Sequence, residues 1–504
     1  MLKRCFSTLM TIIMLFGTAA FAAETNTENT PEKTFKMAGY ESCTTRTWAK
    51  NAFFARMEEN TGIHFEFDEY TDKNNWDAYK NSLTADAALP DVLFKANLSG
   101  GEAIDLMEKG VLIDLKPYIT AEKMPNLTAL LQQFPDVMDA ITLPGGQVAA
   151  LPYINETPLN CGIWVNKTFL SAWGHDMPTD KDSFTEMLRF FVNGDPNRNA
   201  KKDEVGLSFI GPFDLRFLMH AFGLNANNYN MAARNGEAVF VPEEQAYYDF
   251  VSWLHDLYTE GLIDQKGFIN STTTRTVTDE NATATYGVFI SQSPTDVIPA
   301  SWDSKYILMM PLTYQGKQVY RDYFGNCLTG TFAITAACTD VDSIIAWVDL
   351  LYGSEGATLA NAGKRNVEYV IEPNGTWVLT DPQNSYYMQI SQLISGSNPY
   401  PGYSCDDFQM KYNQNSVVDR YAEYRALNAI AVRPFPYFTL SNAEESEVFV
   451  MQLDLGREVD VQLARWVRGD EELTPDSYKA FIDKLYTEYR LQEFKDFWQN
   501  ILSR

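Results

Sequence analysis

The chain of 504 residues lacks the short motifs by which many enzymes are recognised. It has no Gly-x-Ser-x-Gly nucleophile turn, no Gly-x-x-x-x-Gly-Lys phosphate loop and no His-Glu-x-x-His metal helix. Its four histidines are scattered, so they indicate neither a metal cluster nor a catalytic triad. Glycoside hydrolysis needs only two carboxylates, and 66 acidic residues leave that chemistry open.

Cysteine and long apolar runs are also sparse. The six cysteines are widely spaced and include no Cys-x-x-Cys pair, which argues against a zinc or thioredoxin-type site. One disulfide could form, but the sequence does not determine its pairing. Beyond the N-terminal region, no stretch approaches the length of a membrane helix.

Basic residues are outnumbered by acidic ones, 40 against 66, giving a formal net charge of −26. Such a surface repels polyanions, so we expect neither nucleic acid nor an anionic membrane as a partner. The chain is 45% hydrophobic and long enough for two substantial cores.

Residues 1–22 have the features of a secretory signal peptide. A positive region, Lys3 and Arg4, precedes an apolar run that is too short to span a membrane, and small residues follow it. Cys5 comes before the apolar run, so it is not a lipoprotein attachment site. We expect an exported, soluble protein, periplasmic or secreted, with residues 23–33 as a linker.

Segments typical of strands alternate with segments typical of helices, which predicts an α/β protein with a largely parallel sheet. The expected strands are 35–38, 64–70, 89–94, 162–166, 286–290, 307–312 and 330–335, with a Gly-Gly hairpin over 143–153. The expected helices are 46–60, 76–84, 102–109, 182–192, 247–258 and 341–352, followed by a mostly helical tail over 441–504.

A short acidic loop offers alternating oxygen-bearing side chains. Calcium takes six to eight oxygens in irregular geometry, and this spacing resembles an EF-hand loop. Ala200 replaces the usual turn glycine, and Gly206 stands where the bidentate Glu is expected, although Glu204 could supply that carboxylate. The alternative is a solvated Asn/Asp turn without an ion. The candidate ligands are Asp195, Asn197, Asn199, Lys201 through its backbone carbonyl, Asp203 and Glu204.

Several segments in order resemble the family 1 extracellular solute-binding proteins of ABC importers, of the sugar-receptor type. The resemblance is strongest to the larger calcium-binding members, including the alginate-oligosaccharide-binding receptors. In their loop "DPNGNGKKDE" this chain has Arg198 and Ala200 in place of the two glycines. The matching segments are 88–93 (ALPDVL), 110–115 (GVLIDL), 145–153 (GGQVAALPY), 164–166 (WVN), 195–204, 330–334 (GTFAI) and 440–445 (LSNAEE).

The resemblance implies a two-lobed clamp of the type II periplasmic-binding-protein fold, with hinge crossovers between the lobes and extra C-terminal helices. It implies a first lobe of 34–152 plus 311–375 and a second of 153–310 plus 376–504. The calcium loop would be a structural staple in the second lobe, away from the cleft. The expected partners are a carbohydrate and the ABC permease subunits in the membrane, with the receptor itself a monomer.

A sugar receptor needs flat aromatic rings for the C–H faces of the ligand and polar groups for its hydroxyls. In α/β proteins, ligands bind beyond the carboxyl ends of strands, which directs attention to the loops there. Trp48 has core packing as its alternative, and the two glutamates have solvated surface positions as theirs. The predicted contacts are Glu41, Trp48, Tyr153, Asn155, Glu156, Ser291, Trp302, Tyr400 and Tyr403.

The sequence therefore predicts a binding receptor and not an enzyme. A secreted carbohydrate-active enzyme and a ligand-sensing subunit for a chemoreceptor or kinase are the alternatives. The acidic composition argues against a strongly anionic polymer as ligand, unless a local cluster of arginines overrides it.

Overall fold

The computed structural model describes residues 33–42, 47–279, 283–323, 325–373, 375, 377–381, 393–394, 399–404 and 415–504. The predicted signal peptide, and the predicted linker apart from Lys33, lie outside the described residues. Within the described part of the chain, no helix is both long and apolar enough to cross a membrane.

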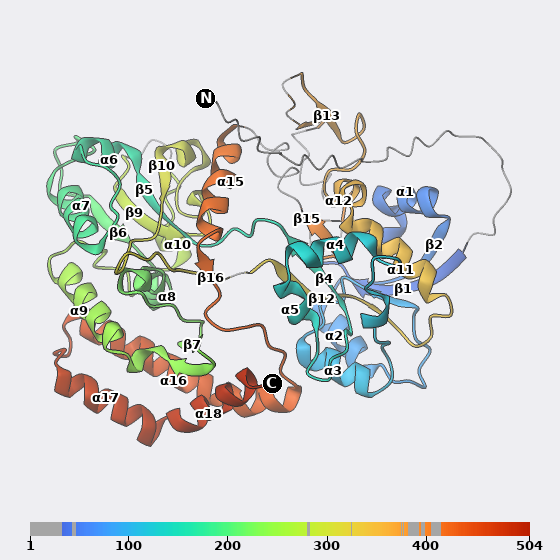
Figure 1. The fold of residues 1–504 in the computed structure, drawn as a ribbon. Helices are drawn as coiled ribbons and strands as arrows, with labels where there is room; N and C mark the ends of the chain where they lie inside the picture. Colours follow the sequence, from blue (N-terminus) through green and yellow to red (C-terminus); the bar gives the residue numbers. More distant parts are fainter. Residues whose placement is uncertain are drawn as a thin grey trace, which may run out of the picture.

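The chain forms two α/β bodies, called here the first and the second lobe (Figure 1). The sheet of the first lobe has the strand order β15-β4-β12-β3-β1-β2. Its parallel pairs are β1 with β2, β1 with β3 and β4 with β15, whereas β12 runs antiparallel to β3 and β4. The strands are β1 (Lys33–Tyr40), β2 (Ile63–Tyr70), β3 (Val92–Phe94), β4 (Leu151–Asn155), β12 (Cys327–Ile334) and β15 (Gly402–Ser404).

The sheet of the second lobe has the order β10-β5-β9-β6, with β6 parallel to β9 and β5 antiparallel to both β9 and β10. Both sheets are thus mixed: parallel pairing predominates in the first sheet, as predicted, whereas antiparallel pairing predominates in the second. The first sheet is mixed because β12 enters it from the other lobe. The strands are β5 (Gly162–Asn166), β6 (Val205–Ser208), β9 (Tyr286–Ser291) and β10 (Tyr306–Met309).

Three two-stranded ribbons complete the strands: β7 (Met231–Arg234) with β8 (Glu237–Phe240), β11 (Tyr320–Arg321) with β16 (Ala431–Val432), and β13 (Tyr369–Ile371) with β14 (Trp377–Leu379). The helices of the first lobe are η1 (Trp48–Lys50), α1 (Ala52–Thr61), α2 (Lys73–Ser82), α3 (Gly100–Glu108), η2 (Lys116–Tyr118), α4 (Pro125–Gln133), α5 (Asp136–Ile141), α11 (Val341–Asp349), η7 (Leu350–Tyr352) and α12 (Ser354–Asn361).

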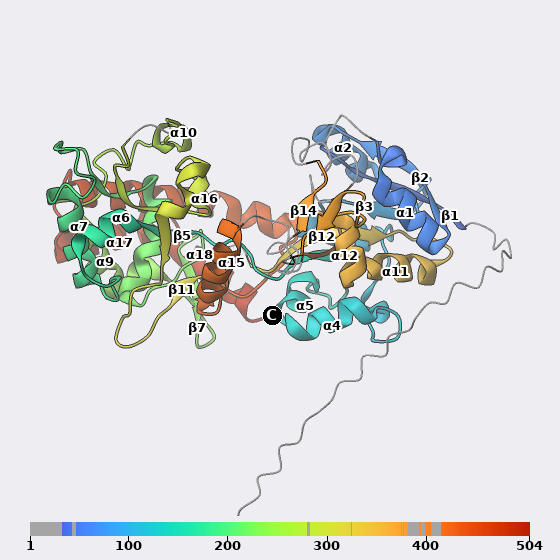
Figure 2. The same ribbon diagram turned by 90° about the horizontal axis from the view of Figure 1, so that it is seen from above.

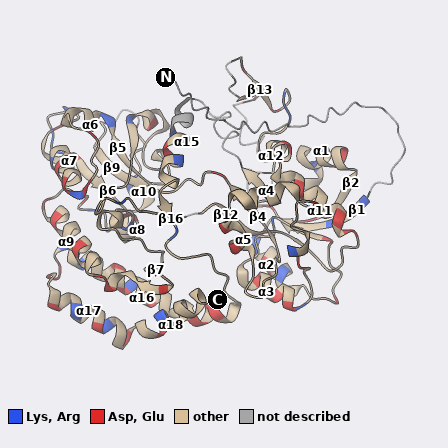
Figure 3. Ribbon diagram, viewed as in Figure 1, with Lys and Arg blue, Asp and Glu red and all other residues tan. Residues whose placement is uncertain are grey.

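The helices of the second lobe are α6 (Lys167–Trp173), α7 (Lys181–Asn193), α8 (Gly211–Leu215), η3 (Arg216–Phe222), η4 (Val241–Glu243), α9 (Gln245–Thr259), α10 (Thr272–Arg275), η5 (Pro294–Asp296), η6 (Ala300–Lys305), α15 (Asn415–Asn428), α16 (Asn442–Arg468), α17 (Pro475–Glu488) and α18 (Leu491–Leu502). Acidic positions stand on helices of both lobes (Figure 3).

Two predicted elements form differently. The predicted helix over 46–60 is split at Asn51, whose side chain accepts the N–H of Phe53 and so caps a new helix. In the predicted hairpin over 143–153 the Gly-Gly turn forms, with the Leu143 N–H donating to the Gln147 carbonyl (2.8 Å). The two flanking segments do not pair as strands, because β4 pairs with β12 and β15 instead. The stretch in between is held by Val148, whose carbonyl accepts the N–H of Leu115.

Each lobe has its own hydrophobic core. The core of the second lobe draws on residues 161–312, Tyr320 and 424–501, and that of the first lobe on 35–154 and 327–360 with Ile394 and Tyr400. The predicted division differs at two places, because Leu312 packs in the second core and β15 belongs to the first sheet.

The C-terminal helices link the lobes a further time. α16 begins beside α3 of the first lobe and packs along α9 of the second. In Figure 2 the helices that end the chain reach from the second lobe toward the first. Arg504 forms an ion pair with Glu444, which joins the last residue to the first turn of α16.

Candidate functional site

Two crossing segments are fastened to each other where they pass between the lobes. Asn326, just before β12, donates its side-chain amide to the carbonyls of Asn155 (3.2 Å) and Glu156 (3.3 Å) at the end of β4. The N–H of Asn155 donates back to the carbonyl of Asn326 (2.7 Å), and that of Glu156 donates to Ser404 (3.0 Å). Backbone groups, together with the side-chain amide of Asn326, therefore define what is called here the hinge layer.

Two adjoining pockets lie beside this layer. The first, about 260 Å³, is lined by the 227–229 loop, by 321–323 after β11 and by 433–438 after β16. The second, about 440 Å³, is bounded by Gly100, Ala140 and Leu328 of the first lobe and by residues of α16. Both pockets are lined by Tyr229, Tyr437 and Phe438. The combined surface thus faces both lobes.

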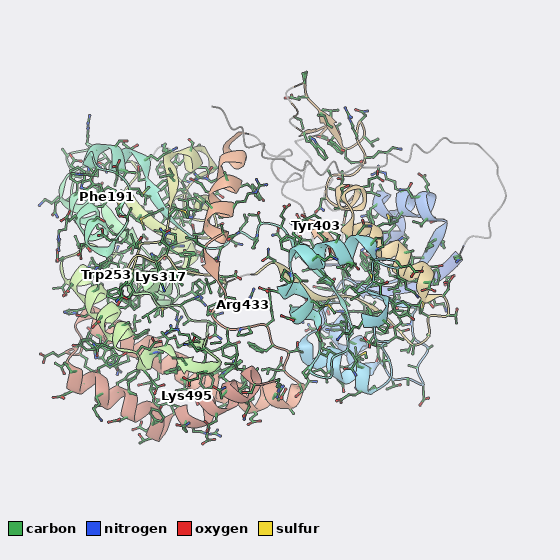
Figure 4. The ribbon with its side chains drawn as sticks, in the orientation of Figure 1. Phe191, Trp253, Lys317, Tyr403, Arg433 and Lys495 are labelled. Carbon is green, nitrogen blue, oxygen red and sulfur yellow. The ribbon has the colours of Figure 1, made fainter. Side chains whose placement is uncertain are left out.

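Arg433 organises one wall of the first pocket, on the stretch between the two lobes (Figure 4). Its Nη2 lies 3.1 Å from Oδ2 of Asp322 and donates to the hydroxyl of Tyr437 (2.6 Å). The guanidinium also stacks on the Tyr437 ring, 3.7 Å from its centroid. Gly325 permits this approach, since a Cβ there would lie 1.9 Å from Arg433 Nη2 and its φ is +68°.

Arg321 also lines the first pocket, and its guanidinium lies in an aromatic cage. Its guanidinium carbon lies 4.9 Å from the ring centre of Tyr323, 5.3 Å from Phe217 and 5.9 Å from Phe213. Nη2 donates to Oδ1 of Asn228 (2.5 Å), whose amide donates to the Tyr323 hydroxyl (3.3 Å). Burial, followed by the charge of Arg216, lowers the pKa of Arg321 to about 10. The cation is still charged at neutral pH.

The predicted ligand contacts fall into three groups. Tyr153, Asn155 and Glu156 on β4 and beyond it, with Tyr400 and Tyr403 near β15, come together at the hinge layer. The rings of Tyr153 and Tyr400 meet edge to face at 5.4 Å, and the Tyr400 hydroxyl accepts from the Asn361 amide. Tyr400 is buried, whereas the other four are half-buried.

Glu41 and Trp48 form the second group, inside the first lobe. The Glu41 carboxylate accepts from Lys95 Nζ (2.8 Å) and from Trp48 Nε1 (3.3 Å). The Trp48 ring is 2% exposed and packs against Phe54 and Phe94. In this conformation Trp48 is a core residue, and its ring presents no open face to a ligand.

Ser291 and Trp302 form the third group, in the second lobe. Ser291 ends β9 and donates its hydroxyl to the carbonyl of Ser293 (2.7 Å). Trp302 is 4% exposed within the hydrophobic core, with Lys305 Nζ 4.2 Å above its ring. Neither residue lines the pockets described above. Their role in binding, like that of the first two groups, stays a prediction.

Sequence reasoning did not select the residues that line the first pocket. Tyr323 was noticeable as an aromatic before β12, but Arg321, Arg433 and Tyr437 were missed. The available signal was the stretch 433–438, in which prolines alternate with aromatic residues. Proline stiffens such a segment, so that it can hold rings at fixed positions.

The acidic loop before β6 folds around its own oxygen atoms. Asp195 accepts the N–H groups of Asn199 (3.0 Å) and Ala200 (3.1 Å), and the Asn199 amide donates to both oxygens of Asp203 (3.0 Å). The loop has positive φ at Asp195 (+48°), Ala200 (+58°) and at Arg198 between them (+56°). The last two are the positions where the resembling loop has glycine.

The donor set of this loop fits a hard cation in composition. Glu204 Oε1 is buried and has no hydrogen-bond partner in the described residues. Burial raises the pKa of Glu204, and the charges of Asp203 and Asp195 raise it further. However, no group of three or more His, Cys, Asp and Glu side chains in the described ranges is arranged to hold a metal ion. Any site would therefore depend on the amide oxygens of Asn197 and Asn199.

No protein-family model matches the chain. A fructooligosaccharide ABC transporter substrate-binding protein, FusA of Streptococcus pneumoniae serotype 4, is 31% identical over 225 residues. That match covers 42% of this chain and 41% of FusA, so it spans about two fifths of the relative.

Two solved structures cover nearly the whole chain. A solute-binding protein of Bifidobacterium longum infantis, described as HMO-binding and ABC-transporter-associated, has a TM-score of 0.75 at 19% identity, over 94% of this chain and 99% of its own. An S. pneumoniae FusA EF-hand mutant in complex with fructo-nystose has a TM-score of 0.65 at 19% identity, over the same shares. The chain therefore has the two-lobed α/β fold of the solute-binding proteins of ABC transporters, and part of it is similar in sequence to a sugar-binding protein of this kind.

Proposed function

We propose that the chain is an extracytoplasmic solute-binding receptor of an ABC importer, and that it binds an oligosaccharide between its lobes. The observation that carries the proposal is the adjoining pair of pockets at the hinge layer, which both lobes line. Tyr229, Tyr437 and Phe438 contribute aromatic rings to the lining, while Asn227 and Asp322 contribute polar side chains. This combination suits the C–H faces and hydroxyl rims of sugars. The names of FusA and of the Bifidobacterium protein support the same class of ligand.

The mechanism we infer is a shift of population between open and closed lobes. A ligand that contacts Leu328 on one side and Phe438 on the other gains more contacts when the lobes approach, so it favours the closed form. The hinge layer can remain intact during this movement, because the Asn326 side chain holds the two crossing segments together. The closed surface would then be recognised by the permease subunits, and the sugar would leave chemically unchanged.

We also propose that calcium binds the loop of Asp195, Asn197, Asn199, Asp203 and Glu204, with the carbonyl of Lys201 as a further oxygen. When bound, the ion supplies positive charge to three carboxylates that otherwise repel one another. The raised pKa of Glu204 and its unpartnered oxygen support the proposal. The solved structure of a FusA EF-hand mutant supports it as well. The loop joins α7 to β6, so the ion would act on the stability of the second lobe.

The function can be tested by presenting the mature chain with a panel of neutral and acidic oligosaccharides. We expect a thermal shift with at least one sugar, a smaller radius of gyration in small-angle scattering, and an unchanged sugar in product analysis. New reducing ends in the mixture would instead indicate the carbohydrate-active enzyme. A ligand-sensing subunit would give the same three results. Binding of the closed form to the permease subunits would indicate import, and binding to a receptor domain would indicate sensing.

A further inference from the structure

We propose that the pocket around Arg321 takes an acidic saccharide, whose carboxylate lies against the guanidinium groups of Arg321 and Arg433. The inference rests on the proposed receptor function and narrows its class of ligand. The overall acidic composition argues against an anionic ligand unless a local cluster of arginines overrides it, and Arg321 and Arg433 lie together in this pocket.

The first argument is the state of Arg321. Its side chain is 5% exposed, yet Nε and Nη1 have no hydrogen-bond partner in the described part of the chain. The charged neighbour that acts most strongly on it is another cation, Arg216, whose own partner is Asp460 on α16. A buried cation without an opposite charge is costly, and a ligand that supplied the anion would offset that cost.

The second argument is the charge of the lining. Among the residues that surround the first pocket, the cations are Arg321 and Arg433, and the carboxylate is Asp322. Asp322 already forms its ion pair with Arg433. The pocket therefore carries an excess of one positive charge in a chain whose formal net charge is −26. The negative electrostatic potential of such an acidic molecule repels anions. An anion can therefore bind only where nearby cationic side chains outweigh that repulsion.

The third argument is the acceptor that Arg321 now uses. Nη2 donates to Oδ1 of Asn228, and Asn228 is an exposed residue at the rim of the pocket. A neutral amide is a weaker acceptor for a guanidinium than a carboxylate, which can also take two parallel hydrogen bonds. A uronic acid can therefore replace Asn228 at Nη2 and retain the aromatic contacts that any sugar ring would make with Tyr323 and Tyr437.

The test compares uronic-acid trisaccharides with their carboxyl-reduced, neutral forms by isothermal titration calorimetry on the mature chain. We expect the acidic form of at least one linkage to bind at least tenfold more tightly than its neutral counterpart. In Arg321→Met the advantage should fall to threefold or less, while Arg321→Lys should keep most of it. Arg189→Met is the matched control, because it removes the same charge from an exposed pair with Glu260.

The outcomes separate the two proposals. If neutral trisaccharides bind as well as the acidic ones, the inference is overturned and the receptor function stands. If no saccharide of either kind binds the parent chain, the proposed function itself fails. If Arg321→Met does not fold, Arg433→Gln should still reduce the acidic preference, and an unchanged preference in that variant would overturn the assignment to this pocket.

Discussion

The guanidinium of Arg275 lies 2.7 Å from the carboxylate of Asp214 in the interior of the second lobe, and both side chains are less than a tenth exposed. Arg275 Nη1 also donates to the carbonyl of Ile290 (3.0 Å), and Asp214 accepts the N–H of Ile210 (2.7 Å). The pair thus ties the segments around α8 and α10 to the end of β9.

Removing one partner of this pair should be strongly destabilising. Asp214→Asn leaves the buried charge of Arg275 without its anion, so we expect a loss of about 3–5 kcal/mol in the free energy of unfolding. Denaturant titration with a probe in the second lobe measures it. Glu260→Gln removes the partner of the exposed Arg189, and should cost far less, because solvent screens this pair. Equal losses in the two variants would show that the buried pair has no special role.

Stability should fall between pH 6.5 and 4 through His220. Burial lowers the pKa of this histidine from 6.5 to about 4, and its Nδ1 lies 2.6 Å from the carbonyl of Phe217. In this interval the unfolded state binds more protons than the folded state, so unfolding is favoured as the pH falls. Once the pH is below both pKa values, the free energy of unfolding should have fallen by about 3 kcal/mol through this histidine.

The measurement is the free energy of unfolding against pH for the parent and for His220→Gln. The difference between the two curves should change across this interval and be flat above it. His175→Gln, the same substitution at an exposed histidine, is the matched control. Parallel curves for the parent and His220→Gln would show that His220 is protonated as easily in the folded chain as in the unfolded one.

The regular elements could be predicted wherever periodicity and end signals agreed. α7 buries Phe184, Leu188 and Phe191 on one face, and β2 buries Ile63 and Phe65 on alternate positions. Local patterns of this kind carry no information about distant pairing. The antiparallel entry of β12, and the place of β15 in the first sheet, depend on segments that lie far apart in the sequence.

The site could be predicted only in outline. Aromatic residues after strands are the kind of residue that lines the pockets. A sequence does not show, however, whether a given loop tryptophan faces solvent or the core. Trp302 lies in the core. Arg321 lies on a strand of two residues, and its partner in β16 is Val432, 111 positions later in the chain. That pairing brings Arg321 beside Arg433, and neither residue has a local pattern that marks it.

Trp302 and Tyr323 should respond differently to truncation. Trp302→Ala removes a ring that is 4% exposed, so we expect a loss of about 3–5 kcal/mol in stability. Tyr323→Ala removes a half-buried ring at the pocket, so the affinity for the sugar should fall at least tenfold with a smaller change in stability. Calorimetry and thermal unfolding on both variants separate the effects. If Tyr323→Ala bound the sugar as tightly as the parent does, the sugar site would not be this pocket.

Calcium should raise the melting temperature, and a chelator should lower it. An ion that binds only the folded state stabilises it by about 2.7 kcal/mol at a hundredfold excess over its dissociation constant. Asp203→Ala should abolish the response, because Asp203 is the carboxylate around which the Asn199 amide is ordered. Glu355→Gln, an exposed change of equal charge on α12 of the first lobe, should keep it.

Since Asn197 and Asn199 would have to turn their oxygens to the ion, Asn199→Asp should bind calcium more tightly than the parent. If neither calcium nor chelator changed the melting temperature of the parent or of any of these variants, the loop would be held by its own hydrogen bonds alone.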